Sequence, residues 1–234
     1  MSVFEQSIIK YHLSKTEFPF SVRTNFGDDQ TYYASYFYRS YEGMPDIEQL
    51  ALDNCKGKIL DVGAGTGSHS LYLQEKGFDV TAIEISESFC EVLIERGVKN
   101  VLCQDYYTLK GLKFDTAIFM MNGIGISKTI DGFIKLLNKL KELLNKDGVA
   151  YIDSADIIYM FDTPEDLKYY EEEVEYYGEI EYHVSDDKNN DPPFQWLFID
   201  KKMLSYIAEA NGFGCEIMLE NDYKAYLAKL WIKE

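Results

Sequence analysis

The chain has 234 residues, 46% of them apolar, and its 23 basic and 40 acidic side chains give a net charge of −17. The composition is that of a globular protein, and the length suits one large domain or a domain with an insertion. A field this negative repels polyanions, so no nucleic-acid partner is expected. No apolar run reaches the roughly 18 residues of a membrane-spanning helix, so no membrane partner is expected either.

The four cysteines are scattered rather than spaced as metal ligands. We therefore expect reduced thiols in a cytoplasmic protein and predict no metal site. The N-terminal residues also lack the apolar core of a signal peptide, which agrees with a cytoplasmic location. The oligomeric state is left open by the sequence.

Residues 1–44 are expected to form an aromatic-rich cap. Residues 2–15 have the spacing of a short amphipathic helix, and residues 16–41 are expected to be irregular. Aromatic side chains are dense in this second stretch, and tyrosine has an apolar body with a polar tip. Two interpretations stay open: these rings cover one edge of the core, or they form a lid over a ligand.

Residues 45–234 are expected to form the main domain, in which short apolar runs alternate with helical patterns. The expected strands are 59–62, 80–83, 98–103, 114–121 and 149–153. The expected helices are 45–54, 68–76, 86–96 and 129–145. Strands that alternate with helices favour a doubly wound α/β fold, with a parallel sheet covered by helices on both faces.

Residues 155–199 interrupt this alternation with an acidic segment. Alternating apolar and polar side chains predict an antiparallel strand pair within residues 172–199, beyond the main sheet. The acidic bias is more typical of a solvated face than of a binding surface. Residues 200–231 then predict one helix and a terminal hairpin of two strands.

The stretch from Lys58 to Ser70 combines a short apolar run, three glycines at two-residue intervals and the start of a helical segment. In a strand–turn–helix arrangement, backbone N–H groups and a helix N-terminus face a bound ligand. Glycines suit such a turn because they accept positive φ and let a ligand approach the main chain.

These features resemble the class I S-adenosylmethionine-dependent methyltransferases. The resemblance rests on Leu60-Asp61-Val62-Gly63-Ala64-Gly65-Thr66-Gly67, on Glu84 and Asp105 after the next two strands, on Phe114-Asp115, and on the terminal hairpin. It implies a Rossmann-like, seven-stranded, mostly parallel sheet with an antiparallel terminal strand, S-adenosyl-L-methionine as the cofactor, and methyl transfer as the activity.

Each predicted cofactor contact also has a physical reason. The glycines let the main chain approach the methionine portion, and the Glu84 carboxylate is able to accept both ribose hydroxyl protons. Asp105 suits the adenine amino group, Tyr106 the adenine ring, and Asp61 the orientation of the turn. The predicted cofactor-binding residues are Asp61, Gly63, Ala64, Gly65, Gly67, Glu84, Ile85, Asp105, Tyr106 and Asn122.

Methyl transfer from a sulfonium is an in-line displacement that needs alignment and exclusion of water more than a reactive side chain. No catalytic residue is therefore assigned, and His69 is expected to be structural. Aromatic faces stabilise cations, which suggests a role beside the sulfonium for Tyr32, Tyr33, Tyr36 and Tyr41. The candidates for positioning the substrate are Asn122, Asp153, Asp156 and Tyr36.

The expected acceptor is a small molecule bound beneath the cap and the 155–199 insertion. A protein or peptide acceptor and a non-catalytic cofactor-binding protein are the alternatives. A nicotinamide-dependent oxidoreductase is disfavoured, because Ser68 stands where the dinucleotide fingerprint has its last glycine.

Overall fold

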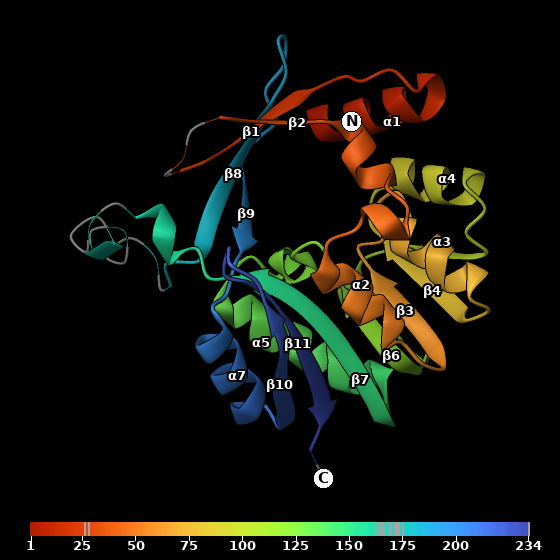
Figure 1. The fold of residues 1–234 in the computed structure, drawn as a ribbon, viewed down its shortest axis with the longest axis vertical. Helices are drawn as coiled ribbons and strands as arrows, with labels where there is room; N and C mark the ends of the chain where they lie inside the picture. Colours follow the sequence, from red (N-terminus) through yellow and green to blue (C-terminus); the bar gives the residue numbers. More distant parts are fainter. Residues whose placement is uncertain are drawn as a thin grey trace.

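A seven-stranded sheet forms the centre of the computed structural model, which describes residues 1–25, 27, 29–161, 163, 167–168, 170, 174 and 176–233 (Figure 1). Its spatial order is β10-β11-β7-β6-β3-β4-β5. The strands are β3 (Lys58–Val62), β4 (Asp79–Glu84), β5 (Asn100–Cys103), β6 (Phe114–Phe119), β7 (Leu144–Ala155), β10 (Phe213–Glu220) and β11 (Ala225–Ile232). The five strands β7, β6, β3, β4 and β5 run parallel to one another, whereas β11 pairs antiparallel with both β7 and β10. The predicted sheet with its antiparallel terminal strand is confirmed.

Helices cover both faces of this sheet. They are α2 (Asp46–Asp53), α3 (Ser68–Glu75), α4 (Glu87–Glu95), α5 (Ile130–Leu143) and α7 (Lys201–Ala210). Helices α2, α3 and α4 pack on one face, and α5 and α7 pack on the other, as Figure 1 shows. On α5, Leu136 and Leu140 are fully buried one turn apart, as the helical periodicity predicts. The doubly wound fold is confirmed.

A second, four-stranded antiparallel sheet has the order β2-β1-β8-β9. Its strands are β1 (Phe20–Thr24), β2 (Gln30–Tyr32), β8 (Glu179–Ser185) and β9 (Phe194–Leu197). The predicted strand pair within residues 172–199 is confirmed in β8 and β9, although residues 172, 173 and 175 lie outside the described part of the chain.

The expectation that residues 16–41 are irregular is wrong. They contain β1, β2 and the 3-10 helix η1 (Ala34–Tyr38), and a second 3-10 helix, η2 (Tyr41–Gly43), follows. Strand β1 pairs with β8 from Ser21↔Ser185 to Thr24↔Tyr182, so the two segments expected as cap and insertion share one sheet. Local patterns do not predict this pairing, because its partners lie far apart in the sequence.

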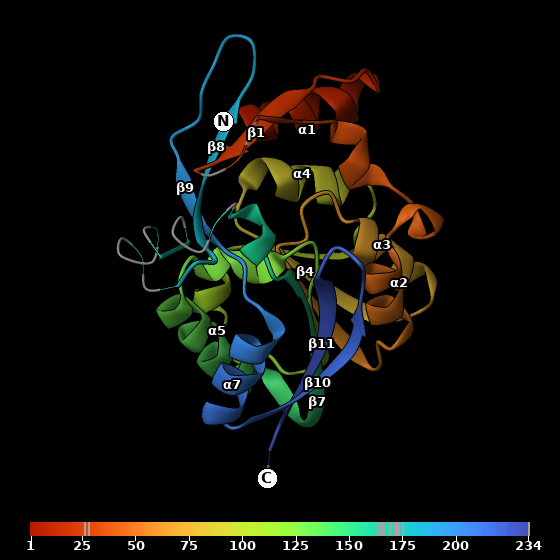
Figure 2. The same cartoon turned by 60° about the vertical axis from the view of Figure 1, so that its left-hand side comes forward.

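The small sheet lies over the carboxyl edge of the main sheet. Strand β9 packs on η4 (Gly123–Ser127), the 3-10 helix that follows β6, and helix α1 (Val3–Ser14) packs on α4. Figure 2 shows α1 and the small sheet above the main sheet from a second direction. Among the helices of the described residues, none has the length and apolar character required to cross a membrane.

Candidate active site

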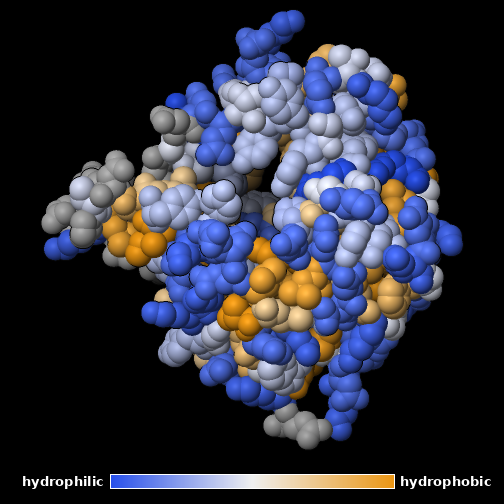
Figure 3. Space-filling view, viewed as in Figure 1, coloured by the Kyte–Doolittle hydropathy of each residue, from blue (hydrophilic) through white to orange (hydrophobic). Residues whose placement is uncertain are grey.

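A pocket of about 630 Å³ lies at the carboxyl edge of the main sheet. Its walls come from the turn after β3, the ends of β4 and β5, η4, α1 and β9. On the face drawn in Figure 3, the surface is hollowed between the upper part of the molecule, which holds the small sheet, and the main sheet below. The volume is that of a typical site for a small molecule or cofactor.

The glycine turn opens the main chain to this pocket. Gly63 and Gly65 have φ values of +69° and +54°. A Cβ atom at residue 63 would meet no described atom within 4 Å. A ligand is therefore able to approach the backbone here, and the predicted reason for glycine at this turn agrees with the geometry.

Glu84 joins the glycine turn to the end of β4. Its Oε2 accepts from the Gly65 N–H at 2.9 Å, and its Oε1 accepts from the N–H groups of Ile85 at 2.8 Å and Ser86 at 3.0 Å. Burial raises the pKa of this carboxyl, and the three backbone bonds act in the opposite direction. A carboxylate has about four acceptor positions, so about one remains for a ribose hydroxyl rather than two.

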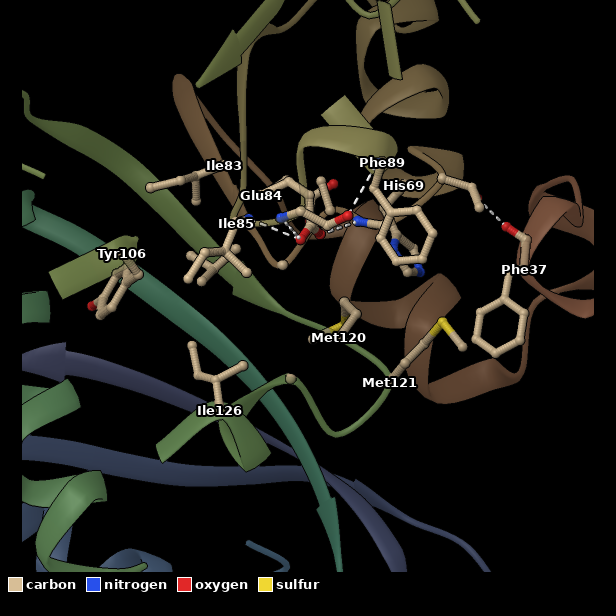
Figure 4. A pocket seen from close by; sticks show the side chains of 18 of the residues that line it. Phe37, His69, Ile83, Glu84, Ile85, Phe89, Tyr106, Met120, Met121 and Ile126 are labelled. Carbon is tan, nitrogen blue, oxygen red and sulfur yellow. Dashed lines mark hydrogen bonds between the residues drawn. The ribbon is translucent and has the colours of Figure 1, made fainter. Parts of the chain in front are cut away.

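Asp105 and Tyr106 form one end of the pocket. The Asp105 carboxylate accepts from the Tyr107 N–H at 2.8 Å and begins the 3-10 helix η3 (Tyr106–Thr108). The Tyr106 hydroxyl donates to the Leu136 carbonyl at 3.3 Å, so it points into the core while the ring faces the pocket. Figure 4 shows Tyr106 at one end of the pocket, Phe37 at the other, and Glu84 between them.

Most of the predicted cofactor-binding residues line this pocket. They are Asp61, Gly63, Ala64, Gly65, Glu84, Ile85, Asp105 and Tyr106. The Asp61 carboxylate accepts from the Ser70 hydroxyl at 2.6 Å, which fits its predicted role in orienting the turn. Gly67 lies outside the lining: its φ is +86°, and a Cβ atom there would lie 2.6 Å from the Leu93 side chain. Glycine at 67 therefore allows α3 and α4 to pack closely.

Asn122 and Asp153 lie behind the pocket rather than in its lining. The Asn122 side chain donates to the Leu197 carbonyl at 3.0 Å and accepts from the Ser154 hydroxyl at 2.8 Å. Its backbone N–H donates to the Asp153 carboxylate at 3.0 Å. These bonds tie the segment after β6 to β7 and to the last residue of β9, which explains the two polar residues without a ligand.

Asp156 and Tyr36 are also absent from the lining of the pocket that the described residues form. Asp156 accepts from the Ile158 N–H at 3.0 Å and from the Tyr177 hydroxyl at 2.8 Å. The Tyr36 side chain is 46% exposed and lies beneath the Arg39 guanidinium. The predicted substrate contacts of both residues gain no support from these positions.

Most of the aromatic walls come from residues that were not among the predicted cofactor or substrate contacts. They are Phe4 on α1, Phe37 on η1, Phe89 on α4 and Trp196 on β9. Tyr41 instead stacks on Tyr72 with ring centroids 4.3 Å apart. The density of aromatic residues in 16–41 indicated that rings gather here, but it did not indicate which rings face inward.

A buried ionic network borders the pocket at the Phe37 end. The Glu48 carboxylate accepts from Arg39 Nη2, and its other oxygen lies 2.6 Å from His69 Nε2. The side chains of Glu48 and His69 are only 5% and 8% exposed. Burial alone would raise the pKa of Glu48, but the bond to His69 and the charges of His69 and Arg39 hold it below its ordinary value. His69 and Arg39 also line the pocket.

Comparison with known proteins agrees with this geometry. Residues 59–148 match the family described as a methyltransferase domain. The putative methyltransferase YqeM of Bacillus subtilis is 31% identical over 129 residues, or 49% of this chain, and the chain spans about half of that relative, 52% of its length.

Solved structures extend the likeness to the whole chain. A SAM-dependent methyltransferase from Bacteroides fragilis, in complex with S-adenosyl-L-homocysteine, is 33% identical, covers 99% of this chain and 94% of its own, and has a TM-score of 0.89. The CcbJ methyltransferase from Streptomyces caelestis, 14% identical over 84% of this chain and 93% of its own, shares the fold with a TM-score of 0.62.

The pocket fits S-adenosylmethionine as the cofactor. The open main chain at Gly63 suits the methionine portion, the remaining acceptor position of Glu84 suits a ribose hydroxyl, and the Tyr106 ring suits adenine. The chain belongs to the class I S-adenosylmethionine-dependent methyltransferases.

Proposed function

We propose that the protein transfers the methyl group of S-adenosylmethionine to a small-molecule acceptor by in-line displacement. The observation that carries this proposal is that the pocket extends beyond Glu84 to Phe37 and Met121 (Figure 4) and that Trp196 also lines it. These three side chains come from separate parts of the fold and enclose space next to the glycine turn. An enclosed space of this kind suits a small acceptor better than an extended polypeptide.

The residues of the chain contribute alignment and exclusion of water. When bound, the cofactor supplies an activated methyl group on a sulfonium. The glycine turn would hold its methionine portion and Glu84 its ribose, and the rings of Phe4, Phe37 and Phe89 line the pocket beside them. Much of the acceleration of a displacement comes from such alignment in a dry site. Aromatic faces also stabilise a nearby cation.

A basic protein or peptide is the second candidate acceptor. The net charge of −17 attracts basic partners and raises their rate of encounter. A small-molecule acceptor and a peptide acceptor are distinguished by measuring methyl transfer to each of them, and not by measuring binding.

The test has two stages. Calorimetry with S-adenosylmethionine, S-adenosylhomocysteine and nicotinamide nucleotides is expected to show binding of the first two only. A methyl-transfer screen that detects S-adenosylhomocysteine release then compares small hydroxyl and amine compounds with basic peptides. Turnover of small compounds supports the proposal, turnover of peptides alone favours the second candidate, and binding with no turnover favours a non-catalytic protein.

A further inference from the structure

We infer that His69 is the general base that removes a proton from the methyl acceptor, with Glu48 holding its ring in position. This inference rests on the proposed function and adds a catalytic residue and a class of acceptor to it. His69 lies in the first turn of α3, next to the glycine turn, and it lines the pocket. In Figure 4, it lies on the Phe37 side of Glu84, away from Tyr106.

The two nitrogens of His69 are placed for different tasks. Nε2 lies 2.6 Å from the Glu48 carboxylate, and this is the one hydrogen bond that the His69 ring makes to the described residues. A carboxylate only accepts hydrogen bonds, so the ring nitrogen beside Glu48 carries the proton. In the neutral ring, the proton is therefore on Nε2 and the lone pair is on Nδ1. The nitrogen without a partner is therefore the one able to take a proton from a ligand.

Glu48 is held rigidly enough to orient the ring. It lies on α2, is 3% exposed, and accepts from Arg39 Nη2 through its second oxygen. Arg39 is fixed in turn, because its Nη1 donates to the Tyr36 carbonyl at 2.6 Å and its guanidinium lies 4.1 Å from the centre of the Tyr36 ring. A base oriented by a buried carboxylate is the arrangement found where proton transfer assists a nucleophile.

The charged groups around the ring strengthen it as a base. They are Glu48 on α2, Asp61 on β3, Arg39 after η1 and Asp153 on β7. Burial lowers the pKa of His69, but the hydrogen bond with Glu48 and the charges of Asp61 and Glu48 outweigh burial and the Arg39 charge. The pKa therefore lies above its ordinary value of 6.5.

The step requires an acceptor with a proton on the attacked atom, such as a hydroxyl or an amine. The acceptor oxygen or nitrogen forms a bond to the methyl carbon, and the carbon–sulfur bond breaks with its electron pair going to sulfur. The acceptor proton passes to His69 Nδ1, and the resulting imidazolium stays paired with the Glu48 carboxylate. The proton then leaves to solvent after product release.

His69→Gln tests the base directly, because its amide is able to donate to Glu48 but does not take up a proton. With an acceptor from the screen, we expect kcat to fall about 10²- to 10⁴-fold. Affinity for S-adenosylhomocysteine is expected to stay within about threefold. His183→Gln is the matched control, since His183 pairs with Glu181 at 2.9 Å outside the pocket. Added imidazole is expected to restore part of the rate in His69→Ala.

The pH profile separates catalysis from a structural role. In the wild type, the rate is expected to fall as pH drops through the raised pKa of His69, because the imidazolium accepts no proton. Glu48→Gln is expected to shift this fall to lower pH. Equal rates in His69→Gln and the wild type overturn the inference. The inference is also overturned if His69→Gln binds S-adenosylhomocysteine more weakly but binds methylthioadenosine equally well, because His69 would then contact the carboxylate of the cofactor.

A second measurement needs no acceptor. Nitrogen NMR of the histidine rings with S-adenosylhomocysteine bound is expected to show a neutral His69 with its proton on Nε2 above the raised pKa. A proton on Nδ1, or a ring still cationic at pH 9, overturns the inference. Failure of the wild type to bind S-adenosylhomocysteine would instead contradict the proposed function, so the two failures are distinguishable.

Discussion

Glu84 supports both the cofactor site and the turn beside it, because one carboxylate accepts main-chain N–H groups from Gly65, Ile85 and Ser86. Glu84→Ala is expected to weaken binding of S-adenosylhomocysteine by more than about 1.5 kcal/mol, since hydrogen bonds to a charged group are lost. Calorimetry measures this change. Glu87→Ala, at an exposed position in the first turn of α4, is the control and is expected to bind normally. Unchanged affinity in Glu84→Ala would remove the ribose assignment.

Gly67 and Gly77 provide a matched pair, because both have positive φ but only one is crowded. A Cβ atom at 67 would lie 2.6 Å from the Leu93 side chain, whereas at 77 it would meet no described atom within 4 Å. Gly77→Ala is expected to lose about 1–2 kcal/mol of unfolding free energy from the left-handed backbone alone. Gly67→Ala is expected to lose a further 1–3 kcal/mol, approximately, from overpacking. Equal losses in urea unfolding would contradict the packing role of Gly67.

At the scale of elements, α1 closes the pocket by contacts with α4 and η1. The Phe4 ring makes edge contacts with Phe37 at 5.1 Å and with Phe89 at 5.4 Å between centroids. Glu5 accepts from the Ser86 hydroxyl at 2.5 Å, and Ser86 also caps α4. The helix is thereby attached next to the Glu84 carboxylate. We propose that it acts as a lid over the cofactor.

Phe4→Ala tests this lid. Loss of the ring opens the pocket above the cofactor, so dissociation of S-adenosylhomocysteine is expected to accelerate several-fold in stopped-flow measurements. Phe18→Ala is the control, because that ring is 36% exposed and lies outside the pocket. The same dissociation rate in wild type and Phe4→Ala would show that α1 does not retain the cofactor.

At the scale of the whole molecule, Asp153 couples stability to pH from its position on β7. Burial raises its pKa from 3.8 to about 7, although two bonds from the Asn122 N–H oppose this change. Between these pH values, the folded state keeps a proton that the unfolded chain releases. The contribution of Asp153 to stability therefore falls as pH rises from about 4 to 7, by at most about 1.4 kcal/mol per pH unit.

Asp153→Asn removes this titration while keeping one acceptor for Asn122. Relative to the wild type, the unfolding free energy of the variant is therefore expected to be higher at pH 8 than at pH 5. Urea unfolding at both pH values measures it. Asp156→Asn is the control, because this carboxylate accepts from the Ile158 N–H and the Tyr177 hydroxyl instead of from Asn122. A difference that stays constant with pH would contradict a raised pKa for Asp153.

The sequence by itself determined the main sheet and most of the cofactor side of the pocket. Ile59 and Leu60 begin an apolar run that forms a buried strand, Gly63 and Gly65 make the turn, and Glu84 ends the neighbouring strand. These features are local: strand period, helix period and turn chemistry depend on residues within one or two elements. The carboxyl ends of adjacent parallel strands then lie at the same edge of the sheet, independently of how the other segments pack.

Only the tertiary structure decided what closes the pocket and which polar groups border it. Strand β1 pairs with β8 across the chain, and the Trp196 ring occupies the space that a side chain at Gly125 would need. Glu48 and His69 meet because α2 and α3 pack on the same face of the sheet. Packing between distant segments decides which strand edges pair and which buried charges meet. A local pattern of residues does not predict these pairings.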